Sequence, residues 1–254
     1  MEEEKKIIEE EKKIKEKLTP VLDLFELSVR IWWKNLVKFI LVGVWGFIYA
    51  LIPVAVILLF AIIMSRQGDN VSLSLEIVSL LAFFFGFCAA IYFMIRGYIG
   101  AFLLIKKNYE GKPLEIFKET KSLAAPYIGL SILTAVLVLL WSLLLIVPGI
   151  IYSVFYSLAV YVFFFEDKRG MAALRRSQEL VKGYWWPVFG RVCFLSLVMW
   201  VFGMVISIPS DMLQEQSVAW RLYNGIIQLF NFLIGPISLL FSYQIYKDLV
   251  NIKK

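Results

Sequence analysis

The stretch YIGLSILTAVLVLLWSLLLIVPGIIYSVFYSLAVYVFFF, residues 127–165, decides the fold. It holds 39 residues and no Asp, Glu, Lys or Arg. A single helix of this length would extend about 58 Å at ~1.5 Å per residue, whereas the hydrocarbon core of a bilayer is about 30 Å thick. The stretch must therefore fold back. Pro148-Gly149 lies near its middle and is typical of a tight turn, so we predict two membrane spans, at about 126–147 and 149–166.

Four further uncharged runs, at 39–64, 77–95, 192–208 and 222–246, predict four more spans. We place these spans at about 36–64, 75–96, 187–209 and 222–246. The composition agrees, because 60% of the 254 residues are hydrophobic and 18% are charged, against about half and about a quarter in soluble domains. We therefore predict an all-α, polytopic membrane protein with a single six-span domain over 19–254. A charged, cytoplasmic N-terminal helix over 1–18 precedes it.

A threefold pattern runs along the chain. Each copy has a charged amphipathic stretch, then aromatic residues, then an apolar segment with one Trp, and ends at a proline. The three prolines are Pro53, Pro148 and Pro209. Because internal repetition determines architecture, we predict three helix-hairpin-like repeats, each begun by an interfacial helix on the cytoplasmic side.

The charged stretches at 21–38, 113–122 and 171–182 are the candidates for these interfacial helices. Tryptophan favours the headgroup level and lysine reaches it with its long side chain, while basic residues attract anionic lipid. The interfacial candidates are Trp32, Trp33, Arg175, Arg176, Lys182, Trp185 and Trp186. The alternative is that these helices are connectors packed beneath the bundle.

The basic residues follow the predicted topology. Of 26 Lys and Arg, only Arg66 and Arg221 lie in loops that join an odd-numbered span to the next even-numbered one. The positive-inside rule then places both termini in the cytoplasm. The net charge of +6 is distributed by topology and forms no single patch, so no nucleic-acid partner is expected. The run EDKR, residues 166–169, closes span four and is expected to be a solvated turn.

Residue types that carry catalysis or bind metals are scarce. The chain has no His, and both of its cysteines, Cys88 and Cys193, lie inside predicted spans. The commonest general base and a frequent zinc ligand are therefore missing. No Ser or Asp has a base beside it in a catalytic pattern. We predict no catalytic site, no metal and no cofactor, and an intramembrane enzyme is disfavoured.

The main polar feature of the spans is uncharged and lies in span six. Residues at spacings of four or three share one helix face. Those on this face are Asn224, Gln228, Asn231, Gly235, Ser238 and Ser242. Span four has a smaller match in Tyr152, Ser153, Tyr156 and Ser157. Amides in lipid need hydrogen-bond partners, so we expect the stripe to point into the bundle. It is either a helix-packing surface or the wall of a polar cavity, between spans four and six, for a lipid headgroup or small solute.

Span two carries two features. Ala82, Gly86 and Ala90 form a stripe of small residues that lets another helix approach closely. Arg96 follows the uncharged run, yet apolar sequence continues beyond it as 97–101. Ionisable side chains inside a membrane are functional candidates by default, so Arg96 is a candidate buried charge.

Several short motifs follow one another between residues 113 and 205. They are Pro148-Gly149-Ile150, Glu166, Ala173–Ser177, Leu180–Gly183 and Trp185-Trp186. This part of the chain resembles the membrane domain of glycerophosphoryl diester phosphodiesterases and related, uncharacterised stand-alone six-helix membrane families of bacteria and archaea. The resemblance implies a six-helix fold in a prokaryotic plasma membrane. In that family the hydrolase activity belongs to a separate soluble barrel with catalytic His, so only the membrane part is implied here.

These observations favour a non-catalytic membrane module that contacts membrane lipid or a partner protein. A protein partner would bind through the N-terminal helix or the cytoplasmic interfacial helices. The alternative is a transporter or lipid-handling protein whose polar cavity lies between spans four and six.

Overall fold

The computed structural model describes residues 18–67, 72–211, 213 and 217–253. Regular structure in these residues is helical throughout, and they contain no strand. The predicted charged helix over 1–18 lies, apart from Leu18, outside the described residues.

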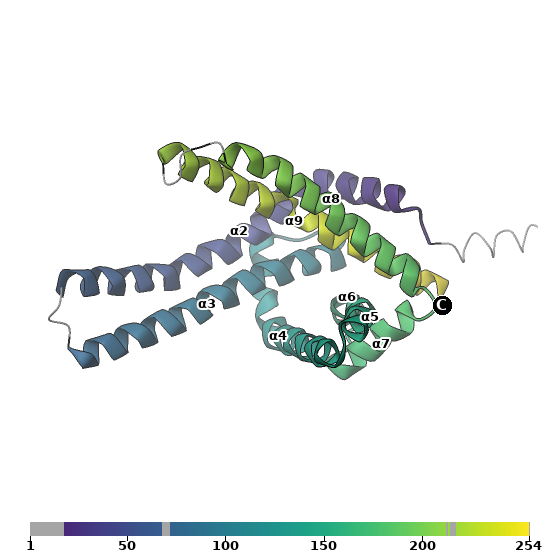
Figure 1. Cartoon of the computed structure of the whole chain (residues 1–254), viewed down its shortest axis with the longest axis horizontal. Coiled ribbons are helices and arrows are strands. Elements are labelled where there is room, and N and C mark those ends of the chain that lie inside the picture. The colour runs from purple at the N-terminus through teal and green to yellow at the C-terminus, as the bar shows by residue number, and fades with distance from the viewer. Residues whose placement is uncertain (1–17, 68–71, 212, 214–216, 254) are drawn as a thin grey trace, which may run out of the picture. The chain divides into compact units, whose positions relative to one another are not determined.

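Eight helices follow one another in the described part of the chain (Figure 1). They are α2 (Val21–Gln67), α3 (Leu73–Lys106), α4 (Pro113–Leu144), α5 (Ile146–Tyr156), α6 (Ala159–Phe165), α7 (Met171–Val181), α8 (Trp185–Asp211) and α9 (Val218–Ile252). Within these residues, six segments are long and apolar enough to cross a membrane, and α5 with α6 makes up the fourth. The prediction of an all-helical, multi-pass membrane protein with six spans is confirmed at this level.

The fold-back within 127–165 occurs three residues before the predicted turn. α4 ends at Leu144, Leu145 is extended (φ −162°, ψ 145°), and α5 begins at Ile146. Pro148 therefore lies in the first turn of α5, where a backbone N–H has no intrahelical partner. Gly149 faces Ser142, whose side chain a Cβ at 149 would overlap. The prediction of a turn at Pro148-Gly149 is wrong, because the proline lies in the first turn of a helix and the glycine allows close packing.

The predicted surface helices differ among themselves. Residues 21–38 and 113–122 are the first turns of α2 and α4 and run without interruption into the spans that follow. Only 171–182 forms a helix of its own, α7. Gly170 and Gly183 flank α7 with positive φ angles of 52° and 89°, a conformation that glycine adopts without steric cost. These two glycines set the limits of the connecting helix.

The described residues divide into two compact units, one holding 37–129 and the other holding 18–36 with 130–253. In the first, α2 and α3 pack through glycines (Figure 1). A Cβ at Gly46 would lie 2.9 Å from the Cα of Gly97, and a Cβ at Gly86 would lie 2.7 Å from Cγ1 of Ile57. The backbones of α2 and α3 therefore come close together at Gly46 and Gly97, and Gly86 of the predicted small-residue stripe makes room for the Ile57 side chain.

The second unit has one well-packed end. The apolar face of α7 (Ala173, Leu174, Leu180 and Val181) is buried, as is the C-terminal half of α9 around Leu240 and Phe241. The N-terminal half of α9 differs, since Leu222 and Leu229 are both 65% exposed. Exposed apolar side chains of this kind suit a helix surrounded by lipid.

Candidate functional site

Polar contacts of the second unit centre on Glu166, the residue that follows α6. Its carboxylate accepts hydrogen bonds from Nε of Arg176 at 3.1 and 3.3 Å, and Nζ of Lys168 lies 3.1 Å away. The hydroxyl of Tyr246 donates to the same carboxylate at 3.3 Å. The Glu166 side chain is only 19% exposed. The expectation of a solvated turn is therefore wrong at Glu166, which joins α6, α7 and α9.

Other residues of the 113–205 motifs attach α7 and α8 to α5. Ser177 Oγ donates to the carbonyl of Phe155 at 2.6 Å, and Nε1 of Trp185 donates to the carbonyl of Ile151 at 3.1 Å. Each bond satisfies a polar side chain in a half-buried place, where an unpaired group would be costly. The motifs that carry the family resemblance thus lie at points where helices are joined.

Lys253 closes the C-terminal end of α7. Its ammonium donates to the carbonyls of Glu179 and Lys182, two acceptors that the helix itself leaves without partners. Burial, together with the positive charge of Arg176, lowers the pKa of Lys253 below its ordinary value. The chain's C-terminal segment therefore fastens α7 from a second side.

Two hydrogen bonds hold the backbone of Thr19, which lies two residues before α2. The N–H of Thr19 donates to Oδ2 of Asp248 at 3.1 Å, and its carbonyl accepts from Nη2 of Arg191 at 2.7 Å. Nη1 of Arg191 also donates to the carbonyl of Pro187 at 3.0 Å. Arg191 is only 7% exposed. Sequence reasoning did not single out these contacts, because the three residues lie far apart in the chain.

The seven predicted interfacial residues fall into two sets. Trp33, Arg175, Lys182 and Trp186 are exposed, with Trp33 and Trp186 at 71% and 73%. Trp32, Arg176 and Trp185 are bonded to protein instead, Trp32 through Nε1 to the carbonyl of Leu233 at 2.8 Å. In each pair of adjacent tryptophans, the indole of the first (Trp32 or Trp185) donates a hydrogen bond to a backbone carbonyl, and the indole of the second (Trp33 or Trp186) is exposed.

Arg96 is buried in the first unit at 8% exposure. Nε donates to Oγ1 of Thr120 and Nη2 to the carbonyl of Phe117, both at 2.9 Å. The guanidinium carbon lies 4.4 Å from the centroid of the Phe117 ring and 5.8 Å from those of Tyr92 and Phe93. Among the described residues no carboxylate pairs with it. The charge is stabilised by neutral acceptors and aromatic faces, an arrangement suited to a guanidinium.

The residues predicted to line a cavity between spans four and six make mostly local contacts. Tyr152 stacks on Trp141 with ring centroids 4.1 Å apart, and Tyr156 is buried beside Tyr152. The hydroxyls of Ser153, Ser157 and Ser238 each donate to a carbonyl three residues earlier in the chain. Ser242 is half-buried.

Spans four and six meet through aromatic side chains. The hydroxyl of Tyr161 on α6 donates to the carbonyl of Leu239 on α9 at 2.9 Å. Tyr243 and Tyr246 of α9 pack against Tyr161 and Phe165. Side chains therefore fill the contact between these two helices.

The amides of the α9 stripe differ in their surroundings. Asn224 Nδ2 donates to Ser210 Oγ at 3.1 Å and to the carbonyl of Trp220 at 2.9 Å. Gln228 and Asn231 are exposed instead. Neither makes a side-chain hydrogen bond with any residue that the structure describes. The stripe was expected to point into the bundle, and these two positions do not.

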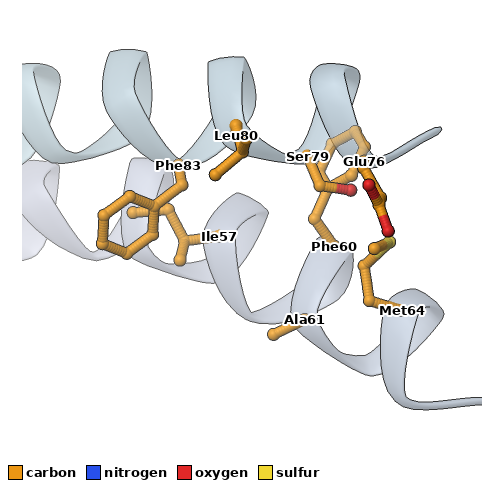
Figure 2. Close-up of a pocket in the computed structure, with 8 residues that line it drawn as sticks. All are labelled: Ile57, Phe60, Ala61, Met64, Glu76, Ser79, Leu80 and Phe83. Carbon is orange, nitrogen blue, oxygen red and sulfur yellow. The ribbon is translucent and has the colours of Figure 1, made fainter. Parts of the chain in front are cut away.

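An apolar cleft of about 390 Å³ opens between α2 and α3 in the first unit (Figure 2). Its lining is apolar except for Glu76, placed beside Met64 in Figure 2, and Ser79. The Ser79 hydroxyl donates to the carbonyl of Leu75 at 2.8 Å. Glu76 is exposed, and the described lining contains no histidine, lysine or arginine. Sequence reasoning did not find it, since its walls consist of the same residue types as a lipid-facing surface.

In the described part of the chain, no three His, Cys, Asp or Glu side chains gather in a way that could hold a metal ion. Comparison with protein-family models, with curated proteins and with solved structures gives no match. The resemblance over 113–205 therefore stays a prediction, and function must be argued from the geometry.

Proposed function

We propose that the protein is a non-catalytic, multi-pass module of a prokaryotic plasma membrane that binds anionic lipid at the cytoplasmic ends of its helices. Both termini lie in the cytoplasm in this proposal, which follows from the distribution of basic residues. The three repeats each bring aromatic and basic residues to this side. Lipid contact, not chemistry, is the activity of the module.

One observation carries the proposal: Arg175 on α7 and Lys182, the residue that follows α7, are both exposed, and so is Trp186 at the start of α8. Positions seven residues apart share a helix face, so both charges lie on one side. The apolar face of α7 is buried in protein and cannot insert into lipid. α7 therefore meets the headgroups with its charged face, while Trp186 reaches the interface that indoles favour.

The carboxylates near this surface offset its positive charge only in part, although Glu179, whose side chain is 66% exposed, lies on the same face as Arg175 and Lys182. Glu166 is engaged by Arg176 and Lys168, and the carboxylate of Glu179 lies 3.5 Å from Nη1 of Arg176. Arg175 and Lys182 make no ion pair with the described carboxylates. They remain available for lipid phosphates, which arginine and lysine bind well. The first repeat adds Trp33 and Lys34, both exposed.

The transport alternative has no comparable support. A route between spans four and six would pass where Tyr161 bonds to Leu239 and the rings of Tyr243 and Tyr246 pack. The serine hydroxyls expected to line it donate to their own helices.

Native mass spectrometry of the detergent-purified protein tests the proposal, with phosphatidylglycerol and phosphatidylcholine as the added lipids. Wild-type protein is expected to retain phosphatidylglycerol in preference to phosphatidylcholine. A basic residue near an anionic surface contributes about 1 kcal/mol. The double variant Arg175→Gln/Lys182→Gln should therefore bind phosphatidylglycerol roughly 30-fold more weakly.

The matched control is Arg66→Gln/Arg221→Gln, which removes the same charge from two exposed positions on the predicted opposite side of the membrane. It should bind phosphatidylglycerol as the wild type does. Equal losses in both double variants would show a response to net charge alone, and full retention in the Arg175/Lys182 variant would refute the proposed surface.

A further inference from the structure

Two side-chain amides on α9 stand out because nothing in the described structure satisfies them. Gln228 and Asn231 are exposed and lie three residues apart on one face of the helix. Their neighbours Leu229 and Phe232 are apolar and exposed at 65% and 46%. This half of α9 therefore presents two hydrogen-bonding groups on a surface that otherwise suits lipid.

Hydrocarbon offers these amides no hydrogen-bond partner. Asn231 lies only three residues from position 234, the middle of the uncharged run 222–246, so it sits within about 4.5 Å of the centre of that run. An amide at such depth is strongly disfavoured unless another polar group meets it. The face that carries Gln228 and Asn231 is thus expected to be covered by protein in the membrane.

The remaining spans of the chain supply no second side-chain amide. The uncharged runs 39–64, 77–95, 127–165 and 192–208 contain no Asn and no Gln. The two other amides of the run 222–246 lie nearer its ends: Asn224 bonds to Ser210 and Trp220, and Gln244 is buried 13 positions beyond Asn231. A side-chain amide both donates and accepts, so its best complement is another amide. The sequence that offers one at this depth is α9 itself.

We propose that this face of α9 is a homodimer interface, in which α9 of one copy packs parallel to α9 of a second copy. Both copies insert with the same orientation, so a two-fold axis along the membrane normal brings residue 231 of one copy beside residue 231 of the other. Each Asn231 then donates to its counterpart and accepts from it, and Gln228 does the same about one turn away.

The same face also leaves room for a close approach. Gly235, one turn beyond Asn231, has no atom within 4 Å of the place a Cβ would occupy. Interfaces between membrane helices favour small residues that let backbones come near and polar residues that bond across the contact. The sequence Gln228, Asn231 and Gly235 supplies both on one stripe.

Single-cysteine cross-linking in native membranes tests this interface. The background is Cys88→Ala/Cys193→Ala, which removes both cysteines of the chain. In it, Asn231→Cys should form a disulfide-linked dimer on copper-phenanthroline oxidation. Leu229→Cys is the matched control, since it is exposed, lies at nearly the same depth and points about 160° away around the helix. It should give little dimer.

A second measurement uses no cysteine. The wild-type protein, fluorescently labelled and diluted in liposomes, should show two-step photobleaching. Asn231→Leu/Gln228→Leu should raise the dimer dissociation constant about tenfold. Equal cross-linking at 229 and 231 would show random collision and overturn the proposal. A wild-type protein that stays monomeric at all densities, with no cross-link at 231, would overturn it as well and would assign the amides to another span of the same chain.

Discussion

Glu166 at the end of α6 accepts two hydrogen bonds from the guanidinium of Arg176 on α7, at 3.1 and 3.3 Å. The two side chains are 19% and 26% exposed, so the pair is screened little by water. Their contact fixes the connecting helix against the membrane spans. It also separates Arg176, which has a structural role, from its neighbour Arg175, which is exposed.

Arg176→Gln should therefore destabilise the protein, because it leaves the Glu166 carboxylate half-buried without its principal partner. A loss of about 1–3 kcal/mol is expected for a charged group deprived of its hydrogen bonds in such a place. A thermal-unfolding scan of the protein in detergent, followed by intrinsic fluorescence, would measure it as a lowered midpoint.

Arg175→Gln is the control for this substitution, with the same change of residue one position away. Exposed charges contribute little, so its midpoint should stay near that of the wild type. If both variants unfolded at the same temperature, the Glu166 contact would not be the stabilising feature that the geometry indicates.

Arg96 gives a second prediction, concerning the first unit. Arg96→Lys keeps the charge but cannot reproduce the two directed bonds to Thr120 and Phe117 or the flat contact with the Phe117 ring. We expect the free energy of unfolding to fall by about 2 kcal/mol. Arg66→Lys, at an exposed site, is the control and should leave it unchanged. Protection of the unit against proteolysis at rising temperature is the measurement, and an unchanged profile for Arg96→Lys would contradict the prediction.

Much of this fold could be predicted from the sequence, because a membrane span depends on length and the lack of charge alone. The six segments follow directly from the uncharged runs. The turn in the longest run could not be located, since proline and glycine occur in tight turns and also near the start of helices. Pro148 can lie in a turn or in the first turn of a helix, and the extended conformation of Leu145, with α5 starting at Ile146, decides for the helix.

The sites were harder to predict for a related reason. Periodicity identified Asn224, Gln228 and Asn231 as one face of a helix, but it cannot say what that face meets. The run 166–169 has the composition of a solvated turn. Its partners, Arg176 and Tyr246, are 10 and 80 positions away, and no local pattern reports contacts of that kind.

Glycine packing between α2 and α3 provides the third prediction. In Gly46→Ala the new methyl group would lie 2.9 Å from the Cα of Gly97 and 3.0 Å from the carbonyl oxygen of Phe93. Both atoms belong to the backbone and cannot rotate away, so the helices must move apart at a cost of about 1–3 kcal/mol. Thermal unfolding should show a lowered midpoint.

Gly203→Ala on α8 should not destabilise the protein, since no atom lies within 4 Å of the Cβ position at residue 203. Alanine also favours a helix over glycine by roughly 1 kcal/mol. The midpoint of this variant should rise or stay unchanged. Two falling midpoints would mean that both glycines matter for a reason other than packing space.

Topology is the fourth prediction, and it determines which side of the membrane the proposed lipid surface faces. In the Cys88→Ala/Cys193→Ala background, Ser72→Cys precedes α3 and Lys112→Cys precedes α4, and both positions are exposed. Since basic residues concentrate on the side of Lys112, the positive-inside rule assigns this side to the cytoplasm. A membrane-impermeant maleimide added to intact cells should label residue 72 and should label residue 112 only after permeabilisation. The reverse order of labelling would mean that the chain has the opposite orientation in the membrane. The exposed face of α7 would then lie at the outer leaflet, and the proposed binding to anionic lipid of the cytoplasmic leaflet would be wrong.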